Sequence, residues 1–245
     1  MTDQVYKELM NRFVEQGGRY PGMDIPEFYP MARALFTPEE ASVVAAMPQG
    51  LFAAEQVAQT LDKSPEEVEI ILQTMAGKGL CFAMDMGGTQ KYALPPFVPG
   101  IFEFQFMRGT KTEHDRKLAK LIYDYKEAYD AIHGIPKVSF PGARVITVDE
   151  KVEPGNKVHT YDQVSAYVES SDPISVVTCY CRHEAELIDP DDTCGKPNEV
   201  CMQFGMGARY LIDHCGARKV SKKEALEILR QAEEASLVHL SMNRQ

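Results

Sequence analysis

Four of the six cysteines lie within 23 residues, at Cys179, Cys181, Cys194 and Cys201. Their spacing is C-x-C, then 12 residues to the third cysteine and 6 residues to the fourth. Four thiolates are the ligand set of a tetrahedral zinc ion or of a cubane iron–sulfur cluster. The intervening residues 182–193 are polar and hold no long apolar run, so we expect them to wrap a site rather than to fill a core. The sequence therefore predicts an inorganic centre at these cysteines.

The spacing alone does not decide between zinc and an iron–sulfur cluster. Structural zinc usually takes paired C-x₂-C knuckles, whereas this sequence has a C-x-C and a C-x₆-C pair, which weakens the case for zinc. The remaining interpretation is four buried, inert thiols, but such thiols seldom cluster. We expect Cys179 and Cys181 to share one side of an extended strand. We expect Cys201 near the start of a helix over residues 199–212, where the helix dipole favours a thiolate.

Two other residues are lower-ranked candidate ligands. His183 follows Cys181 by two residues, and Cys215 is either a fifth ligand or, in the interpretation we favour, a spare thiol. Cys81 lies in an apolar segment and is expected to be a packed core thiol. The G-x-G at residues 205–207 is a weak nucleotide-binding signal, because the sequence predicts no strand directly before it and no third glycine follows in register.

Composition excludes several classes of protein. The 245 residues include 26 lysines and arginines against 36 acidic residues, a formal charge of −10. No basic run offsets this charge, so nucleic acid is not expected as a partner. No apolar stretch is long enough to span a bilayer, and the polar N-terminus is unlike a secretory signal. We therefore expect no membrane insertion and a cytoplasmic location, where clustered cysteines serve as ligands more often than as disulfides.

The first hundred residues are rich in helix signals. Threonine or serine followed three residues later by glutamate opens two of the predicted helices, after Thr37 and after Ser64. Together with a hairpin around Gly87-Gly88, three helices give the element order of a winged helix. The predicted elements are a helix over 3–16, an extended arm over 19–30, helices starting at 37, over 51–61 and over 64–77, and hairpin strands over 80–86 and 91–94.

The rest of the chain alternates helices and strands. Residues 95–106 are rich in proline and phenylalanine and predict a packed connector. The apolar stripe of a long helix over 112–133 is expected to be core, and a homodimer seam is the alternative use. The further predicted elements are a strand over 144–148, a helix over 161–170, a strand over 174–178, helices over 199–212 and 221–235, and a strand over 237–240.

These elements predict a mostly helical α+β fold. An N-terminal winged-helix-like module is followed by a small Cys-rich α/β metal-binding domain. The predicted division is an N-terminal helix and arm (1–30), the winged-helix-like module (31–107), a long helix and connector (108–160) and the Cys-cluster domain (161–245).

The cysteine motifs carry a resemblance to a known family. Cys179-Tyr-Cys181-Arg182, Cys194-Gly-Lys-Pro197 and Cys201-Met-Gln-Phe-Gly205 resemble those of 4Fe-4S ferredoxin-type proteins of anaerobic microbes. The Thr37-Pro-Glu-Glu and Val98-Pro-Gly-Ile-Phe-Glu103 segments look like the winged-helix-like part of that family, and the resemblance covers about residues 30–243. It implies a 4Fe-4S cluster on Cys179, Cys181, Cys194 and Cys201, electron transfer and redox protein partners. Members often continue into a cysteine-dense ferredoxin domain, of which this sequence has no motif, so the resemblance implies at most one cluster here.

Three functions remain open from the sequence. The favoured one is an electron-transfer protein of an anaerobic redox system, or an oxidoreductase subunit, rather than a stand-alone enzyme. A winged-helix transcriptional regulator that responds to metal or redox state is the second, but residues 64–79 hold three glutamates and a single lysine, which suits DNA poorly. A structural zinc protein with an interaction role is the third.

Overall fold

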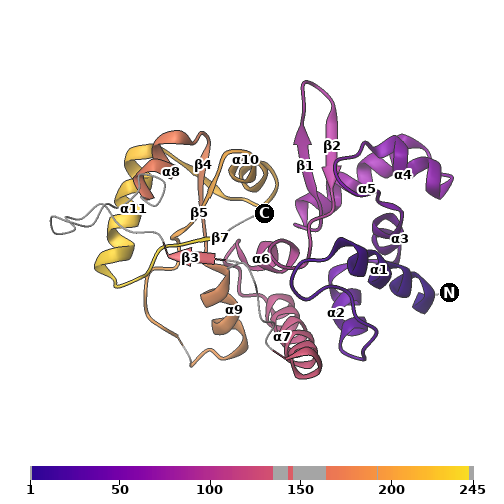
Figure 1. Ribbon diagram of the computed structural model, residues 1–245, viewed down its shortest axis with the longest axis horizontal. Helices are drawn as coiled ribbons and strands as arrows, with labels where there is room; N and C mark the ends of the chain where they lie inside the picture. The colour runs from indigo at the N-terminus through magenta and orange to yellow at the C-terminus, as the bar shows by residue number, and fades with distance from the viewer. Residues whose placement is uncertain (1, 135–142, 146–163, 192, 243–245) are drawn as a thin grey trace. The chain divides into compact units, whose positions relative to one another are not determined.

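The computed structural model describes residues 2–134, 143–145, 164–191 and 193–242 (Figure 1). It is an α+β protein, 57% helical with small antiparallel sheets, as predicted for the fold class. The chain forms two compact units: an N-terminal unit of Met1–Gly134 with Tyr180–Thr193, and a C-terminal unit of Ile135–Cys179 with Cys194–Gln245. The four-part division of the sequence stays a prediction, and its boundary at residue 160 lies outside the described residues.

The N-terminal unit is built from helices and one hairpin. The predicted helix over 3–16 and the long helix over 112–133 are confirmed by α1 and α7. The elements are α1 (Thr2–Gln16), α2 (Phe28–Leu35), α3 (Pro38–Ala46), α4 (Ala54–Leu61), α5 (Pro65–Gly77), β1 (Phe82–Asp85), β2 (Gln90–Ala93), α6 (Ile101–Phe106), α7 (Glu113–His133) and α9 (Tyr180–Ile188).

The helix starts follow local capping signals. Thr37 Oγ1 accepts a hydrogen bond from the Glu40 backbone N–H at 3.2 Å, and Glu40 Oε2 accepts one from the Thr37 N–H at 2.9 Å. The same reciprocal capping box opens α5 at Ser64 and α7 at Thr112. These boxes satisfy backbone donors that a helix start leaves without partners, which confirms the helix starts predicted at Thr37 and Ser64.

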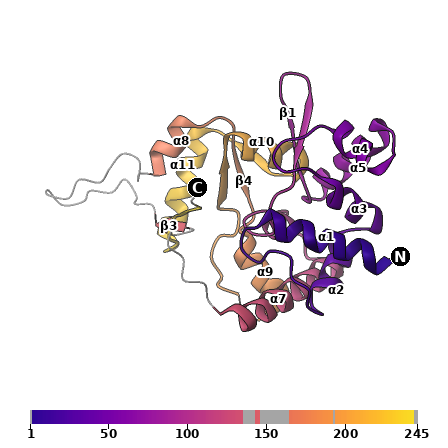
Figure 2. The ribbon, with the colours of Figure 1, turned by 45° about the vertical axis from the view of Figure 1, so that its right-hand side comes forward.

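The predicted hairpin is confirmed, and a third segment joins it. Strands β1 and β2 pair antiparallel, with Ala83 opposite Tyr92. Gly87 and Gly88 form the turn with φ of 69° and 85°, angles that a residue with a Cβ rarely adopts. Phe52 pairs with Tyr92 through two backbone hydrogen bonds of 2.9 and 2.8 Å. A short extended segment between α3 and α4 therefore extends the hairpin, which projects beyond α4 and α5 in both views (Figures 1 and 2).

An aromatic core holds the N-terminal unit together. The Phe97 ring stacks on Phe13 at a centroid distance of 3.8 Å and on Phe102 at 4.8 Å, and all three are buried. The connector over 95–106 is packed, as predicted, but its second half forms α6, which the sequence did not indicate. The extended arm predicted over 19–30 ends earlier than expected, because α2 begins at Phe28. Pro30 stands in the first turn of that helix, where a missing N–H costs nothing.

The C-terminal unit is a small sheet covered by helices. Its three strands are antiparallel in the order β5-β4-β6, with β4 (Ile174–Val177) in the centre, β5 (Cys201–Phe204) and β6 (Arg218–Val220). Figures 1 and 2 show α8 (Val164–Ser170) and α11 (Lys222–Glu234) on one side of β4 and α10 (Gly205–His214) on the other. Ile174 and Val176 of β4 share a buried core with α8 and α11. This core fixes β4, and therefore the point at which the chain reaches Cys179.

Two predictions about the Cys-rich segment are wrong. The helix expected over 199–212 is strand β5 followed by α10, and Gly205, with φ of 59°, makes the turn between them. A strand therefore does precede the G-x-G, although the sheet is antiparallel and not the parallel sheet of a dinucleotide-binding fold. The polar segment over 182–193, expected to be a loop, is helical up to Ile188 as part of α9. Its polar residues turn out to face other polar groups of the N-terminal unit.

The ends of the C-terminal unit match the predictions in part. A short ladder joins β3 (Ala143–Val145) to β7 (Leu240–Met242), whereas the strands were expected over 144–148 and 237–240. Residues 146–148, and residues 161–163 at the start of the predicted helix over 161–170, lie outside the described residues. The helix predicted over 221–235 is confirmed by α11. Within the described ranges, no helix combines the length and the apolar character needed to cross a bilayer.

Candidate metal-binding cysteines

Cys179 and Cys201 are backbone neighbours in the C-terminal unit. Cys201 begins β5 directly opposite Val177, the last residue of β4, and Cys179 follows two residues later. The chain at Cys179 still runs beside its partner, since the Cys179 N–H donates to the Asn198 carbonyl at 2.7 Å. Both cysteines are partly exposed. The pairing of β4 with β5 therefore brings these two candidate ligands to the same end of the sheet. No local sequence signal indicates this placement.

Cys194 lies in the segment that leads into β5. Its side chain is exposed, and the neighbouring Gly195 has a φ of 63°. The segment is fastened to the end of α11, because Lys196 Nζ donates to the carbonyl oxygens of Ala235 and, at 3.4 Å, of Ser236. This contact also places a cation at the C-terminal end of a helix, where the helix dipole favours it.

Cys181 belongs to the N-terminal unit, in the first turn of α9, and is exposed. Our expectation that it shares a strand with Cys179 is wrong, and so is the expectation that Cys201 starts a helix. The cysteine that does lie at the start of a helix is Cys181. The helix dipole in the first turn stabilises a thiolate, which is the form that binds metals.

Polar side chains hold α9 against α7 and the segment that precedes it. Glu184 is buried and pairs with Lys126 of α7 at 2.7 Å, and Glu186 pairs with Lys111. His183 is 1% exposed, and its Nε2 lies 2.8 Å from the Thr110 carbonyl oxygen. A carbonyl oxygen only accepts hydrogen bonds, so His183 Nε2 is the donor, and this bond orders the start of α9. As a candidate ligand, His183 would bind a metal through Nδ1 if Nε2 keeps this contact.

The two remaining cysteines are in the core. Cys81 is completely buried, its Sγ lies 3.4 Å from the Leu72 carbonyl, and burial raises the pKa of its thiol. Cys215, after α10, is 1% exposed. The four clustered cysteines are thus the solvent-accessible ones, and the two outside the cluster are buried. Cys81 is the core thiol that its apolar context predicts.

The described residues do not form a complete ligand cage. Across residues 2–134, 143–145, 164–191 and 193–242, no three Cys, His, Asp or Glu side chains are arranged to hold one metal ion. The structure gives the backbone position and exposure of each candidate, and Cys181 lies in a different unit from Cys179, Cys194 and Cys201. The assignment of the four cysteines as ligands stays a prediction.

No family model matches this chain, and no curated protein or solved structure matches it either. Its function is therefore argued from its own residues.

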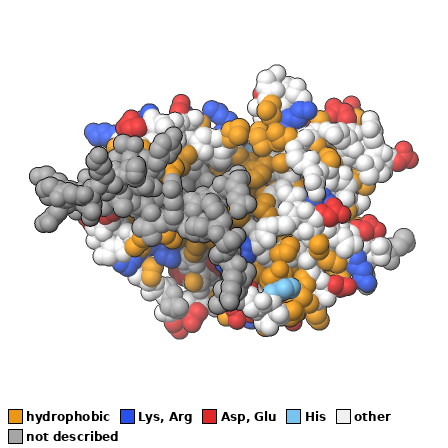
Figure 3. All heavy atoms as spheres, viewed as in Figure 1, with side chains coloured by type: hydrophobic (Ala, Val, Ile, Leu, Met, Phe, Trp, Pro, Cys, Tyr) orange, Lys and Arg blue, Asp and Glu red, His pale blue; other side chains and the backbone are white. Residues whose placement is uncertain are grey.

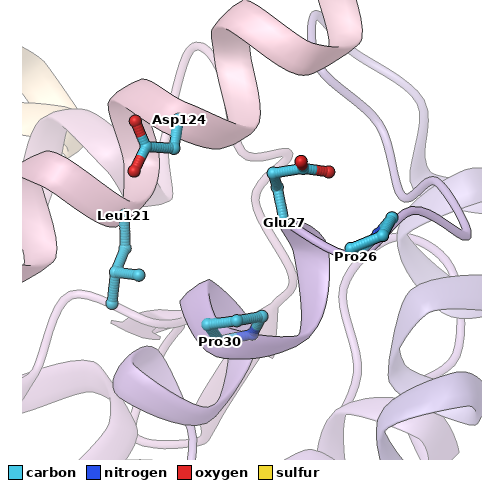
Figure 4. Close-up of a pocket in the computed structure, with 5 residues that line it drawn as sticks. All are labelled: Pro26, Glu27, Pro30, Leu121 and Asp124. Carbon is cyan, nitrogen blue, oxygen red and sulfur yellow. The ribbon is translucent and has the colours of Figure 1, made fainter.

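The described surface of the N-terminal unit includes one small hollow. A hollow of about 220 Å³ in the N-terminal unit is lined by Leu121 and Asp124 of α7 and by Pro26, Glu27 and Pro30 at the start of α2 (Figure 4). These five residues supply two carboxylates and no serine, cysteine, histidine or lysine, so they do not pair a nucleophile with a base. On the face shown in Figure 3, the hydrophobic side chains over α2 and α7 are interspersed with charged ones. The clustered cysteines remain the strongest candidates for chemistry in the described chain.

Two residues of this region were missed by sequence reasoning. Tyr180 begins α9, which packs on α6, and Glu103 of α6 is buried; burial raises the pKa of both side chains. The available signal was the spacing of Tyr180, His183, Glu184 and Leu187, which is that of one helix face. Residues 182–193 were predicted as a loop because they are polar and hold no long apolar run.

Proposed function

We propose that this chain is an iron–sulfur protein that carries electrons, with one 4Fe-4S cluster bound by Cys179, Cys181, Cys194 and Cys201. The observation that carries the proposal is the division of the six cysteines: the four within 23 residues are accessible, and the other two are buried. Inert structural thiols are normally buried, whereas metal-binding thiols need access and a thiolate-stabilising environment. The first turn of α9 provides such an environment for Cys181.

The donor set suits a cluster chemically. Four thiolates satisfy the four irons of a cubane, and the bound cluster would supply one-electron transfer. The proposed ligands come from a strand end, a loop and a helix start. This combination favours an electron carrier or an oxidoreductase subunit over a stand-alone enzyme, and redox proteins are the partners that it implies.

The N-terminal unit suggests how such a partner docks. We infer that residues 31–107 are a winged-helix-like module, supported by the order α3, the Phe52 segment, α4, α5 and the β1–β2 hairpin. The helix in the recognition position, α5, exposes Glu66, Glu67 and Ile70, and none of its residues is lysine or arginine. An acidic face with an apolar side chain suits a protein surface better than phosphates, so the regulator that binds DNA is the weaker proposal.

Metal analysis tests the proposed function directly. The full chain is purified without oxygen, reconstituted with iron and sulfide, and assayed for iron, zinc and visible absorption. We expect roughly four irons per chain and the broad charge-transfer absorption of a cluster. Iron-free protein that keeps one tightly bound zinc would instead establish the structural zinc protein.

A pair of serine variants tests the ligand assignment. Cys194→Ser removes an exposed thiol and is expected to lose the cluster. Cys81→Ser changes a buried thiol in the N-terminal unit and is expected to keep the metal content of the wild type. Equal loss in both variants means that the ligands are assigned wrongly.

A further inference from the structure

Helix α7 has one face in the core of the N-terminal unit and another at its surface. The apolar stripe, for which a homodimer seam was the alternative use, is buried through Leu118, Ala119, Ile122 and Tyr125 and therefore belongs to the core. The opposite face is exposed or half-buried, and its residues recur every three or four positions. In chain order they are Arg116, Lys117, Lys120, Tyr123, Asp124 and Glu127. Both views show α7 at the edge of this unit (Figures 1 and 2).

The charges of this outer face change sign at its middle. The three basic side chains precede Tyr123, which is 40% exposed, and the two acidic ones follow it. Lys120 and Asp124 form an ion pair whose side chains are 61% and 40% exposed. A lysine that precedes its acidic partner by four residues is the less favourable order on a helix, and exposed pairs contribute little. The stability of α7 therefore does not explain this order of charges.

A second copy of α7 has the charge pattern that complements this face. When two such helices lie antiparallel and cross at their middles, the basic half of each covers the acidic half of the other. Lys120 and Glu127 are equally far from the boundary between Tyr123 and Asp124, so each faces the other across the pair. Two-fold symmetry makes this contact twice, and it brings the two Tyr123 side chains to the centre, where protein interfaces are rich in tyrosine.

We propose that the outer face of α7 is a docking surface for a second copy of this chain, in an antiparallel pair with two-fold symmetry. The 21 residues of α7 give a helix about 31 Å long. One such helix pair is expected to bury less than the roughly 1,200 Å² at which stable complexes begin, so the dimer is transient. The formal charge of −10 on each chain opposes association, but salt at 0.1 M limits this repulsion to a range of about 10 Å. Association through α7 does not depend on a bound cluster.

The test is sedimentation velocity of the full-length protein over a series of concentrations, in which the wild type should show a monomer–dimer equilibrium. Lys120→Glu and Glu127→Lys each turn two attractive contacts into two repulsive ones, so each should raise the dissociation constant about tenfold. An equimolar mixture of the two variants should associate about as the wild type does, because the two reversed charges attract each other and the two unchanged ones still pair. Lys7→Glu and Glu8→Lys make the same charge changes at exposed positions of α1, and these controls should behave as the wild type.

The outcomes distinguish local pairing from an effect of net charge. Glu127→Lys makes an acidic chain less negative, so net charge alone would strengthen association where the pairing of α7 weakens it. A wild type that stays monomeric at every concentration overturns the proposal, and so does a dimer that neither reversal weakens. Weakening in both variants without recovery in their mixture overturns the antiparallel arrangement. Recovery in the mixture also excludes misfolding of either variant.

Discussion

The ion pair between Lys126 and Glu184 offers a quantitative test of how α9 is held. Lys126 Nζ lies 2.7 Å from Glu184 Oε1, and the side chains are 23% and 9% exposed. Lys126→Met keeps the length of the side chain and removes its charge, which leaves a buried carboxylate without its partner. Removing one member of a buried pair costs about 3–5 kcal/mol, and water that reaches the partly exposed lysine reduces this to about 2–3 kcal/mol.

The double variant gives the sharper number. Lys126→Met with Glu184→Met replaces the whole pair by apolar groups, and such replacements are often close to neutral. We therefore expect the double variant to be more stable than Lys126→Met alone, with a coupling energy of about 2 kcal/mol in the double-mutant cycle. Lys120→Met is the control on the same helix, because its i,i+4 pair with Asp124 is exposed and should contribute only about 0.3–0.5 kcal/mol.

Hydrogen exchange at the α9 amides is the appropriate assay. The chain has two compact units and no tryptophan, so a single global unfolding curve does not isolate this helix. Exchange reports the opening free energy of α9 itself. A decrease of about 2 kcal/mol in this free energy corresponds to a roughly thirtyfold faster exchange. Additive effects of Lys126→Met and Glu184→Met, with a coupling below about 0.5 kcal/mol, would refute the view that this pair holds α9.

Three further predictions follow from burial and capping. Because burial raises the pKa of Glu103 above its ordinary 4.5, the folded protein holds that proton to higher pH than the unfolded chain does. The free energy of unfolding should therefore fall as pH rises through this window, and Glu103→Gln should remove that component in urea titrations. In the metal-free protein, a thiol reagent should modify Cys181 and Cys194 rapidly, while Cys81 should react only after denaturation, as peptide mapping would reveal. Thr112→Ala should destabilise α7 by about 1 kcal/mol in thermal or urea unfolding, since Thr112 Oγ1 accepts from the Asp115 N–H at 3.1 Å; no loss would mean that the cap is dispensable.

The features predicted correctly from the sequence are those decided by near neighbours. The capping boxes at Thr37 and Ser64 need only a partner three residues away, so the starts of these helices could be located from the amino-acid sequence alone. The same is true of the Gly87-Gly88 turn, where glycine supplies the positive φ that the turn needs. The buried strand β4 was identified from its run of apolar residues.

The features predicted wrongly depend on distant partners. Cys201 to Phe204 contains Met202 and Gln203, which are good helix formers, and becomes a strand because β4 offers a ladder of hydrogen bonds. Residues 182–188 of α9 were predicted as loop because they are polar, and the groups that pair with them lie on α7 and at residues 110–111, far away in the sequence. The spacing of the cysteines indicated the candidate ligands, but it held no information about the helix that carries Cys181.

The polar inner face of α9 has a consequence for the proposed cluster ligand. Apolar faces tolerate small slips of one helix over another, because dispersion contacts are not directional. Each polar contact of α9 fits one register: His183 Nε2 meets the Thr110 carbonyl at 2.8 Å, and Glu184 meets Lys126 at 2.7 Å. A slip by one turn would leave a buried carboxylate without its partner, which costs several kcal/mol. The polar contacts thus allow α9 a single position and fix the backbone of Cys181 with it, and a thiolate that binds a rigid inorganic cluster needs a backbone held in this way.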